Sequence, residues 1–489
     1  MYLSNAEKLS ENERLIRQIK KYSPQLGGLF DMHVSLRDYS ASLYKFNPPA
    51  EHLRRQEIIR KKLAEKIEKL FGVGAMKGLK VNLSGALAFN IADHHQVLNH
   101  PFLVSSNIIS SVGKFLQEEK QEAIVVISSG DVPPNNFFSR NGFTFHNHKV
   151  PIFSNSERES VSYYLPKRDF DFIAKLKVAD LWRQFTPEEQ KFLSAERDRI
   201  VSYDYSRCRD YNDQISLIIK NSWPYLFAPD LRKTLPELIF ITQEELVTEC
   251  LIELLAEDNI LSRCLFDREF RAEVLDNFRG IVVAWREDEG KGTHFFWRKY
   301  PGRSQSLRLY LEGDSLVPTD ERFKDLAVPL ERKAVIELLK AREIYPSLFM
   351  IFGVLNYYAG VKPLSGYGSI TYLHLMKQAW LKTLSKFNMN EESKLLETVE
   401  AKSLVAGLAL FFKKKDGKLK TLYASDIIYD GGISAEYLRT AFDMNFSDFL
   451  SVSTVDMYDY LSQKYIPAEE KMTLNINSDD LAEIRFDWL

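Results

Sequence analysis

The residues best suited to chemistry gather in one short stretch of this chain. It contains an acid, three histidines and two amides: Asp93, His94, His95, Gln96, Asn99 and His100. Because imidazole titrates near neutral pH, the histidines could bind a phosphate or carboxylate and serve as general acids or bases. They could instead hold a divalent metal with Asp93, or hydrogen-bond the backbone and only shape the loop. The metal alternative is less favoured, because adjacent histidines rarely aim at one ion and no HExxH motif is present.

The position of this stretch favours a ligand site. Residues 83–91 and 123–128 are short apolar runs without polar alternation, which predicts two buried parallel strands. Between them Pro101 opens a predicted helix, so the unit is strand–helix–strand with a right-handed crossover. The histidine loop then lies at the carboxyl edge of the sheet and feeds a helix N-terminus, where an anion is favoured. The loop SGDVPPNN follows the second strand, so we expect Asp131 and Asn135 to face the histidines across one crevice.

A second candidate lies far along the chain. The segment SGYGS (365–369) opens a predicted helix, and glycines there let backbone N–H groups approach a ligand closely. Gly366 and Gly368 would admit a phosphate or nucleotide, and Lys377 on the helix would counter its charge. The alternative is an ordinary turn and helix cap.

Two further clusters have simpler explanations. His146 and His148 would share one strand face and could chelate, although a solvated face is favoured. In THFFWRKYPGR (293–303), basic and aromatic residues interleave and could stack bases, but a β-hairpin with one buried face is favoured. The chain has no GxGxxG, Walker A or GxSxG motif, which disfavours classical dinucleotide oxidoreductases, P-loop NTPases and α/β-hydrolases.

The remaining pattern predicts the elements that position these residues. A surface helix follows Pro49, and LIFI (238–241) predicts a strand before a helix that Thr242 and Glu245 would start with a capping box. Further on, IVVAW, THFFWRKY and SLRLYLEG predict an antiparallel meander, and Asp416-Gly417 marks a hairpin. The predicted fold is α/β, a Rossmann-like parallel-sheet core with a helical N-terminal segment and antiparallel β additions. Its predicted parts are a helical segment at 1–80, the core at 81–280, a β-meander insertion at 281–330, a helical segment completing the core at 331–400, and a C-terminal α+β segment at 401–489.

The amino-acid composition limits the classes of protein to which this chain can belong. The 489 residues are 45% hydrophobic, which is enough for a sizeable core and excludes a disordered or fibrous protein. A formal charge of −2 gives no global positive field, which disfavours a nucleic-acid partner. Three cysteines form no CxxC pair, as is typical of a reducing compartment. Neither a signal-peptide pattern nor an uninterrupted apolar run of roughly 18 residues occurs, so we expect a cytoplasmic protein without a membrane partner.

Two segments, ADHHQVLNHP and SGYGSITYLHLMKQ, resemble signatures of one family, the cysteine-adding enzymes of bacillithiol biosynthesis. In that family a GQQ-type loop precedes a Gly/Pro-containing helix start, and a later GPGE-type entry opens a helix beginning AYWLQLK. The order and approximate positions agree, while His94-His95-Gln96 replaces the double glutamine and Ser369 replaces the acidic residue. The resemblance implies a Rossmann-like core with helical additions and a cleft that binds a nucleotide or sugar-linked substrate.

Together these features predict a small-molecule biosynthetic enzyme, a ligase or transferase that joins an amine- or thiol-bearing building block to an activated or phosphorylated partner. The expected roles are catalytic for His94, His95, His100 and Asp131, substrate-binding for Gln96, Asn99, Asn135 and Lys377, and cofactor-binding for Gly366 and Gly368. A nucleotide cofactor is compatible with this site and a divalent metal is less favoured; a small-molecule partner is expected, and a homo-oligomer is compatible. The alternatives are a metal-dependent hydrolase or lyase using Asp93 and the histidines, and a non-catalytic interaction protein on an α/β scaffold.

The predicted helix start also carries an expectation for His100. A helix N-terminus favours a neutral imidazole over an imidazolium, so the pKa of His100 should lie below its ordinary value of about 6.5 in the empty protein. It should rise when an anion binds.

Overall fold

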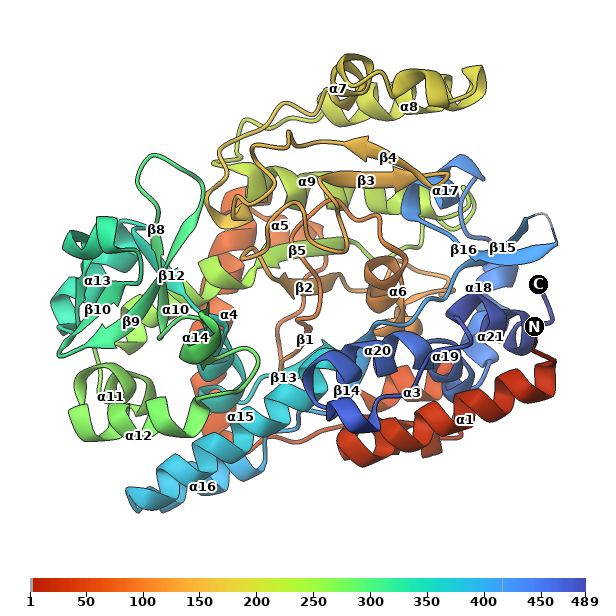
Figure 1. The fold of residues 1–489 in the computed structure, drawn as a ribbon. Coiled ribbons are helices and arrows are strands. Elements are labelled where there is room, and N and C mark those ends of the chain that lie inside the picture. Colours follow the sequence, from red (N-terminus) through yellow and green to blue (C-terminus); the bar gives the residue numbers. More distant parts are fainter. Residues whose placement is uncertain (1–2, 416) are drawn as a thin grey trace.

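A five-stranded parallel sheet forms the centre of the computed structural model, which describes residues 3–415 and 417–489 (Figure 1). The strand order is β14-β13-β1-β2-β5, and every neighbouring pair is parallel. The strands are β1 (Ala88–Asn90), β2 (Ile124–Ser128), β5 (Leu238–Thr242), β13 (Lys362–Gly366) and β14 (Ser403–Ala406). The predicted α/β class with a parallel core is therefore confirmed. The first strand is shorter than the apolar run at 83–91, because only its last third pairs with β13 and β2.

The order of the strands places a switch in direction between β1 and β13. From β1 the chain moves outward to β2 and then β5, and it later returns to the other side of β1 to add β13 and β14. The connections after β1 and after β13 therefore leave the sheet in opposite directions. Such a point opens a crevice at the carboxyl ends of the two strands, where α/β proteins bind ligands.

Helices cover both faces of this sheet and bury two large apolar cores. One core packs against helices from both ends of the chain: α1 (Asn5–Tyr22), α2 (Pro24–Gly27), α3 (Leu36–Ser42), α6 (Pro101–Ile109), α9 (Tyr211–Ser222), α17 (Ala424–Tyr429), α18 (Ala435–Asp443), α19 (Phe446–Val452), α20 (Thr454–Lys464) and α21 (Ser478–Arg485). The other core packs against α4 (Ala50–Phe71), α5 (Ala75–Gly78), α10 (Gln243–Leu254), α11 (Ile260–Phe266), α12 (Arg268–Phe278), α13 (Arg332–Lys340), α14 (Leu348–Phe352), α15 (Tyr367–Lys386) and α16 (Asn390–Glu397). Lys8 Nζ lies 2.7 Å from Asp480 Oδ1, which joins α1 to α21 where the chain ends meet (Figure 1).

Antiparallel strands form separate sheets around this core. The largest has the order β11-β10-β9-β8-β12 and lies beside α10–α14 (Figure 1). Its strands are β8 (Phe296–Lys299), β9 (Ser306–Glu312), β10 (Ser315–Pro318), β11 (Val328–Pro329) and β12 (Ile344–Pro346). The predicted strands in THFFWRKY and SLRLYLEG are thus confirmed as a hairpin. IVVAW does not join them, because only Trp285 continues into β6 (Trp285–Arg286), which pairs with β7 (Lys291–Gly292).

Two local predictions concern the start of a helix and the turn of a hairpin. Thr242 is the N-cap of α10, but its side chain makes no capping hydrogen bond, and Glu245 pairs with Lys66 and Arg209 instead of completing a capping box. The later hairpin is present as β15 (Phe412–Lys415) and β16 (Lys418–Thr421); Asp416 lies outside the described residues.

His146 and His148 also differ from prediction. His146 lies in the turn between β3 (Gly142–Phe145) and β4 (His148–Pro151), with φ of 47°, so the two rings do not share a strand face. His146 Nδ1 lies 2.5 Å from Glu189 Oε1 on α8 (Pro187–Val201), while His148 Nδ1 lies 3.1 Å from Gln184 Oε1. The short helix α7 (Phe172–Val178) completes this part of the chain.

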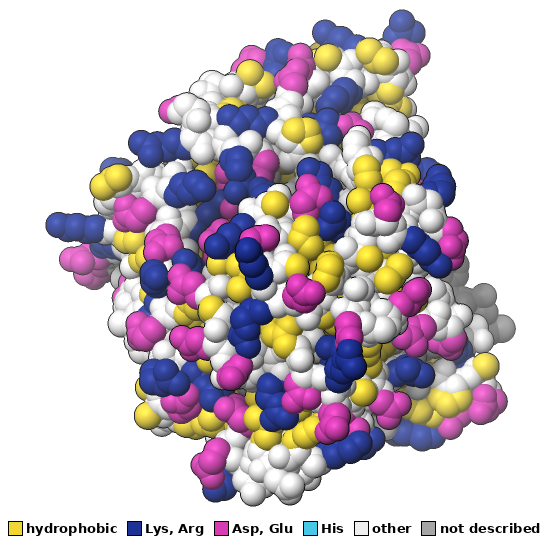
Figure 2. Space-filling model, turned by 90° about the vertical axis from the view of Figure 1, so that its left-hand side faces the viewer, with side chains coloured by type: hydrophobic (Ala, Val, Ile, Leu, Met, Phe, Trp, Pro, Cys, Tyr) yellow, Lys and Arg dark blue, Asp and Glu magenta, His cyan; other side chains and the backbone are white. Residues whose placement is uncertain are grey.

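The surface has mixed charge. Figure 2 shows acidic and basic side chains interspersed over the face that carries the large antiparallel sheet, without a broad area of one sign. Among the described residues, no helix combines the length and the apolar composition that crossing a membrane requires.

Candidate functional site

A pocket of about 500 Å³ occupies the switch point between β1 and β13. It brings together the two segments that the sequence singled out separately, the histidine loop after β1 and the glycine-rich entry to α15. Four further segments complete the wall: the start of α6, the loop after β2, the end of β14, and α20. Its lining residues are Ala92, His94, Phe102, Leu103, Phe137, Phe138, Gly366, Tyr367, Gly368, Ser369, Tyr372, Ala406, Gly407, Asp456, Asp459, Tyr460 and Gln463.

His94 is the histidine of the loop that reaches this pocket. Its backbone forms an isolated parallel bridge with Ser129, the residue that follows β2. Nδ1 lies 3.3 Å from Asn136 Oδ1, and the ring meets Phe138 edge-on at a centroid distance of 4.7 Å. Burial lowers the pKa of His94 to about 4, so the ring is neutral at pH 7. A neutral imidazole can both donate and accept a hydrogen bond, which suits contact with a polar ligand.

The N-terminus of α15 forms a second wall. Gly366 is the N-cap, with extended φ and ψ and no side-chain capping bond, and the first residues of this 20-residue helix line the pocket. The leading N–H groups of α15 therefore have no side-chain cap where the helix meets the pocket. A Cβ on Gly368 would lie 2.7 Å from the Tyr460 ring, and one on Gly407 would lie 2.2 Å from the Tyr367 ring. A side chain at either position would therefore force a pocket tyrosine to move.

The third wall is one face of α20, and it is acidic. Asp456, Asp459, Tyr460 and Gln463 are spaced to share a helix face. Asp456 Oδ2 accepts a hydrogen bond from Ser478 at 3.0 Å, and burial raises the pKa of this carboxyl. Asp459 Oδ2 accepts from Gln463 Nε2 at 2.8 Å. Since the lining includes no lysine or arginine among the described residues, this side of the pocket favours a positively charged group.

The histidine next to His94 has a structural position. His95 is fully buried; its Nε2 donates to the Asn212 carbonyl at 2.8 Å and its Nδ1 accepts from the Ser128 hydroxyl at 2.7 Å. Both ring nitrogens are therefore occupied by protein groups. Burial lowers the pKa of His95 to about 4. The ring ties β2 to α9, and the structure does not bring it to the pocket.

Asp93 also supports the loop from within. Its two carboxylate oxygens accept from the Ser106 hydroxyl at 2.7 Å and from Asn107 Nδ2 at 2.8 Å, both on α6. Burial raises the pKa of Asp93 to about 7. The described residues contain no group of three or more His, Cys, Asp or Glu side chains that could hold a metal ion. Asp93 is thus engaged with α6 rather than arranged with the histidines as a ligand set.

His100 caps the helix it precedes. Its Nδ1 accepts from the Phe102 N–H at 3.3 Å, and its ring packs against Phe138 and Tyr423. The expected lowering of its pKa is confirmed, to about 3, but burial is the main cause and the Arg140 charge the second. The predicted helix-terminus effect is not among these causes.

Gln96 and Asn99 face the loops beside them. Gln96 Nε2 donates to the Pro133 carbonyl at 3.4 Å. Asn99 Oδ1 accepts from the Thr144 N–H at 2.9 Å and its Nδ2 donates to the Ser425 hydroxyl at 2.9 Å. These contacts fix the histidine loop against β3 and α17.

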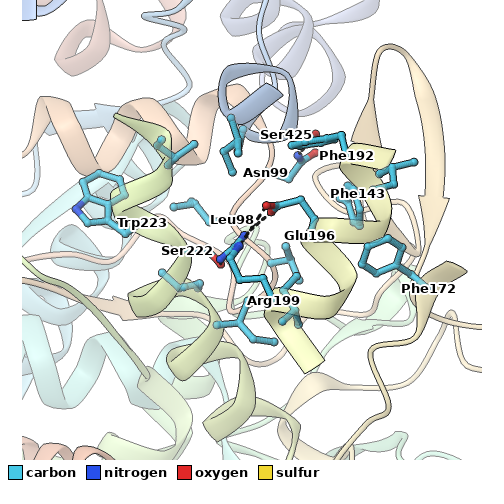
Figure 3. Close-up of a pocket in the computed structure, with 18 residues that line it drawn as sticks. Leu98, Asn99, Phe143, Phe172, Phe192, Glu196, Arg199, Ser222, Trp223 and Ser425 are labelled. Atoms are coloured by element: carbon cyan, nitrogen blue, oxygen red, sulfur yellow. Dashed lines mark hydrogen bonds and ion pairs between the residues drawn. The ribbon is translucent and has the colours of Figure 1, made fainter. Parts of the chain in front are cut away.

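Asn99 also lines a separate cavity of about 60 Å³ between α8 and α9, shown in Figure 3. Aromatic and aliphatic side chains form most of its wall, and the one ion pair drawn joins Glu196 to Arg199. The cavity is too small for a drug-sized ligand and presents few polar groups.

Asp131 and Asn135 do not meet His94 directly. Asp131 accepts from the Tyr345 hydroxyl at 2.5 Å, and burial together with the Glu244 charge raises its pKa to about 8. Glu244 accepts from the Gly130 N–H at 2.7 Å, and burial raises its pKa to about 7. Asn135 is exposed, and the residue beside it, Asn136, makes the contact with His94. The loop was thus found from the sequence, but the contacting amide was missed by one position.

Lys377 lies away from the pocket. Its Nζ donates to the backbone carbonyls of Glu397 and Val399, both at 2.8 Å, and so holds the end of α16 against α15. We expect Lys377→Met to lower the free energy of unfolding by about 1–2 kcal/mol, because two carbonyls lose a charged donor.

Urea denaturation of Lys377→Met measures this loss, and Lys382→Met, at an exposed position on the same helix, is the control. Ligand binding in the pocket should be unchanged. Equal stability of both variants, or loss of binding in Lys377→Met alone, would contradict this placement.

The pocket residues that sequence reasoning missed are mainly those of α20. Asp456, Asp459, Tyr460 and Gln463 follow helical spacing, so their shared face was visible in the sequence. Nothing in that spacing showed that a helix some 90 residues after the glycine-rich entry returns to cover it.

The comparisons with known proteins add no relative. No protein-family model, curated protein or solved structure matches this chain. The geometry of the pocket therefore carries the functional argument.

Proposed function

We propose that this protein is a small-molecule biosynthetic enzyme, a ligase or transferase that joins an amine- or thiol-bearing building block to an activated or phosphorylated partner in the switch-point pocket. The observation that carries the proposal is the joint lining of one pocket by an open helix N-terminus, a neutral histidine and two carboxylates. A single pocket in which one wall favours an anion and another favours a cation suits two substrates, or one substrate with an anionic and a cationic end.

We also propose that the core is Rossmann-like. Numbering only the parallel strands in chain order, the sheet reads 3-2-1-4-5 from β5 to β14. That order matches the first five strands of the dinucleotide-binding order 3-2-1-4-5-6, and it supports ligand binding at the carboxyl edge. The two segments that resemble the bacillithiol family lie at the carboxyl ends of β1 and β13, which are neighbouring strands.

The pocket residues suggest separate roles. The first N–H groups of α15 would hold a phosphate or other anion, since the helix dipole and the uncapped turn both favour negative charge. Asp456 and Asp459 would hold an ammonium group. His94 would hydrogen-bond the attacking amine or thiol, and Tyr367, Tyr372 and Tyr460 supply flat apolar surface for the body of a substrate.

A thermal-shift screen against amino sugars, amino acids, sugar phosphates and nucleotides tests this proposal. A ligand bound only by the folded state adds about 2.7 kcal/mol at a hundredfold excess over its dissociation constant. We expect at least one amine-bearing and one phosphorylated compound to raise the melting temperature. The double variant Asp456→Asn/Asp459→Asn should lose the response to the amine and keep the response to the phosphate.

The matched control is Asp276→Asn/Asp288→Asn, two exposed carboxylates without ion pairs among the described residues. It should respond to both compounds like the unmodified protein. No response from any compound, or amine binding that survives in both double variants, would refute the proposed site.

A further inference from the structure

A second, larger cavity lies at the opposite edge of the same sheet. Its volume is about 600 Å³, and it includes Lys362 and Ser403, the first residues of β13 and β14. The remaining wall comes from α2, α3 and the segments beside them. Because β13 ends at Gly366 in the switch-point pocket, one strand connects the two cavities at its two ends. The volume lies within the range of small-molecule sites.

The charges of this cavity are unbalanced. Lys45, Lys362 and Lys402 line it, and Glu400 is its one acidic lining residue. The Lys362 side chain is only 5% exposed, and its Nζ lies 3.0 Å from Glu400 Oε2 and 4.9 Å from the centre of the Phe46 ring. Lys45 and Lys402 are exposed and form no ion pair with any described residue. Two cations therefore remain without a protein anion.

The other side of the cavity is apolar. Leu29, Met32, Tyr39 and Leu43 present carbon surface, and Gln25, Ser42 and Ser403 supply neutral polar groups. The Tyr39 hydroxyl donates to the Leu404 carbonyl, which fixes the ring on β14. A ligand that fits both sides must have a compact anionic group attached to a flat or apolar body.

A smaller cavity of about 80 Å³ also includes Lys362 and Glu400. It is lined by His52, which is 1% exposed and whose Nε2 has no hydrogen-bond partner among the described residues. Gly360 is required beside this ring, since a Cβ there would lie 2.3 Å from it. A buried polar atom without a partner is costly, and a ligand group or water would satisfy it.

We propose that this amino-edge cavity binds an organic phosphate of about nucleotide size. The phosphate contacts Lys45 and Lys402 beside the Lys362–Glu400 pair, and the body of the ligand packs on Leu29, Met32 and Leu43. This site is distinct from the switch-point pocket, and it uses a different chemistry, since its anion is held by lysine side chains rather than by a helix N-terminus.

Isothermal titration calorimetry with AMP tests the assignment, with inorganic phosphate as the second probe. AMP should bind the unmodified protein, and phosphate should bind more weakly because it lacks the body. Lys45→Glu/Lys402→Glu should weaken AMP binding at least tenfold. Glu400→Gln should strengthen it by about two- to fivefold, because Lys362 is freed from an exposed partner.

Two controls make the result specific. Lys191→Glu/Lys340→Glu changes the total charge equally at exposed positions elsewhere and should leave AMP binding unchanged. His94→Ala alters the switch-point pocket and should also leave it unchanged. The proposal is overturned if AMP gives no heat at millimolar concentration, if both lysine double variants lose binding equally, or if His94→Ala loses binding while Lys45→Glu/Lys402→Glu retains it.

Discussion

His95→Ala should lower the free energy of unfolding by about 3–4 kcal/mol, whereas His94→Ala should lower it by less than about 1 kcal/mol. The two residues are adjacent, but His95 is fully buried with both ring nitrogens hydrogen-bonded, to Asn212 and Ser128. Its removal leaves a cavity and two buried polar groups without partners. His94 is partly exposed and makes one hydrogen bond of 3.3 Å. Urea denaturation followed by circular dichroism measures both values.

The same two variants distinguish a structural role for His95 from a ligand-binding role for His94. His94→Ala should fold normally and lose most of the response to the ligands of the switch-point pocket. A second variant, His95→Gln, keeps some of the hydrogen-bonding capacity and should recover part of the lost stability. If His94→Ala proved as unstable as His95→Ala, or if it bound every pocket ligand normally, the assignment of His94 to the pocket would be wrong.

The stability of the folded chain should fall as the pH rises from about 6.5 to 8. Burial raises the pKa of Asp93 to about 7, of Asp131 to about 8 and of Glu244 to about 7. In the unfolded chain these carboxyls ionise near pH 4, so above that pH the folded state binds more protons than the unfolded state. Stability then decreases with rising pH until each group has ionised in the folded state.

Histidines oppose this effect near and below pH 6.5. Burial lowers the pKa of six of them below the ordinary value of about 6.5, so there the unfolded state gains protons that the folded state does not. They are His52, His94, His95, His100, His294 and His374. Because these histidines are still half protonated at pH 6.5 in the unfolded chain, their opposition fades only as the pH approaches about 7.5. Between pH 6.5 and 8 the net expected loss is therefore about 1–2 kcal/mol.

Chemical denaturation at a series of pH values measures this loss, and Asp131→Asn provides the comparison. An asparagine oxygen can still accept the Tyr345 hydroxyl but cannot ionise, so the loss should disappear in this variant. A stability of the unmodified protein that stays constant or rises between pH 6.5 and 8 would contradict the proposed protonation of these carboxyls.

The sequence by itself determined the elements at the carboxyl edge. The continuous apolar run at 123–128 predicted a buried parallel strand and LIFI at 238–241 predicted a strand, and the structure contains them as β2 and β5. Pro101 and the glycine-rich entry at 365–369 predicted the starts of α6 and α15. These features are local, because strand burial, helix starts and backbone freedom depend on the residue types within a few positions.

Side-chain direction was decided by the tertiary structure alone. Asp93, His94 and His95 are consecutive, yet Asp93 turns to α6, His94 to the pocket and His95 to α9. Polarity in the sequence does not distinguish a ligand contact from a buried hydrogen bond, since both require the same side chains. The predicted capping box of Thr242 and Glu245 is absent from α10 for a similar reason, because the Glu245 carboxylate pairs with Lys66 and Arg209 and not with the helix end.

The assembly of the pocket also depends on the tertiary structure. β1 and β13 are separated by more than 270 residues, and only the sheet order makes them neighbours. The same holds for α20, whose carboxylates reach the pocket because the C-terminal helices pack beside the sheet on the side of α6. Sequence spacing specifies each face, but which faces meet depends on how the separate apolar surfaces are buried together.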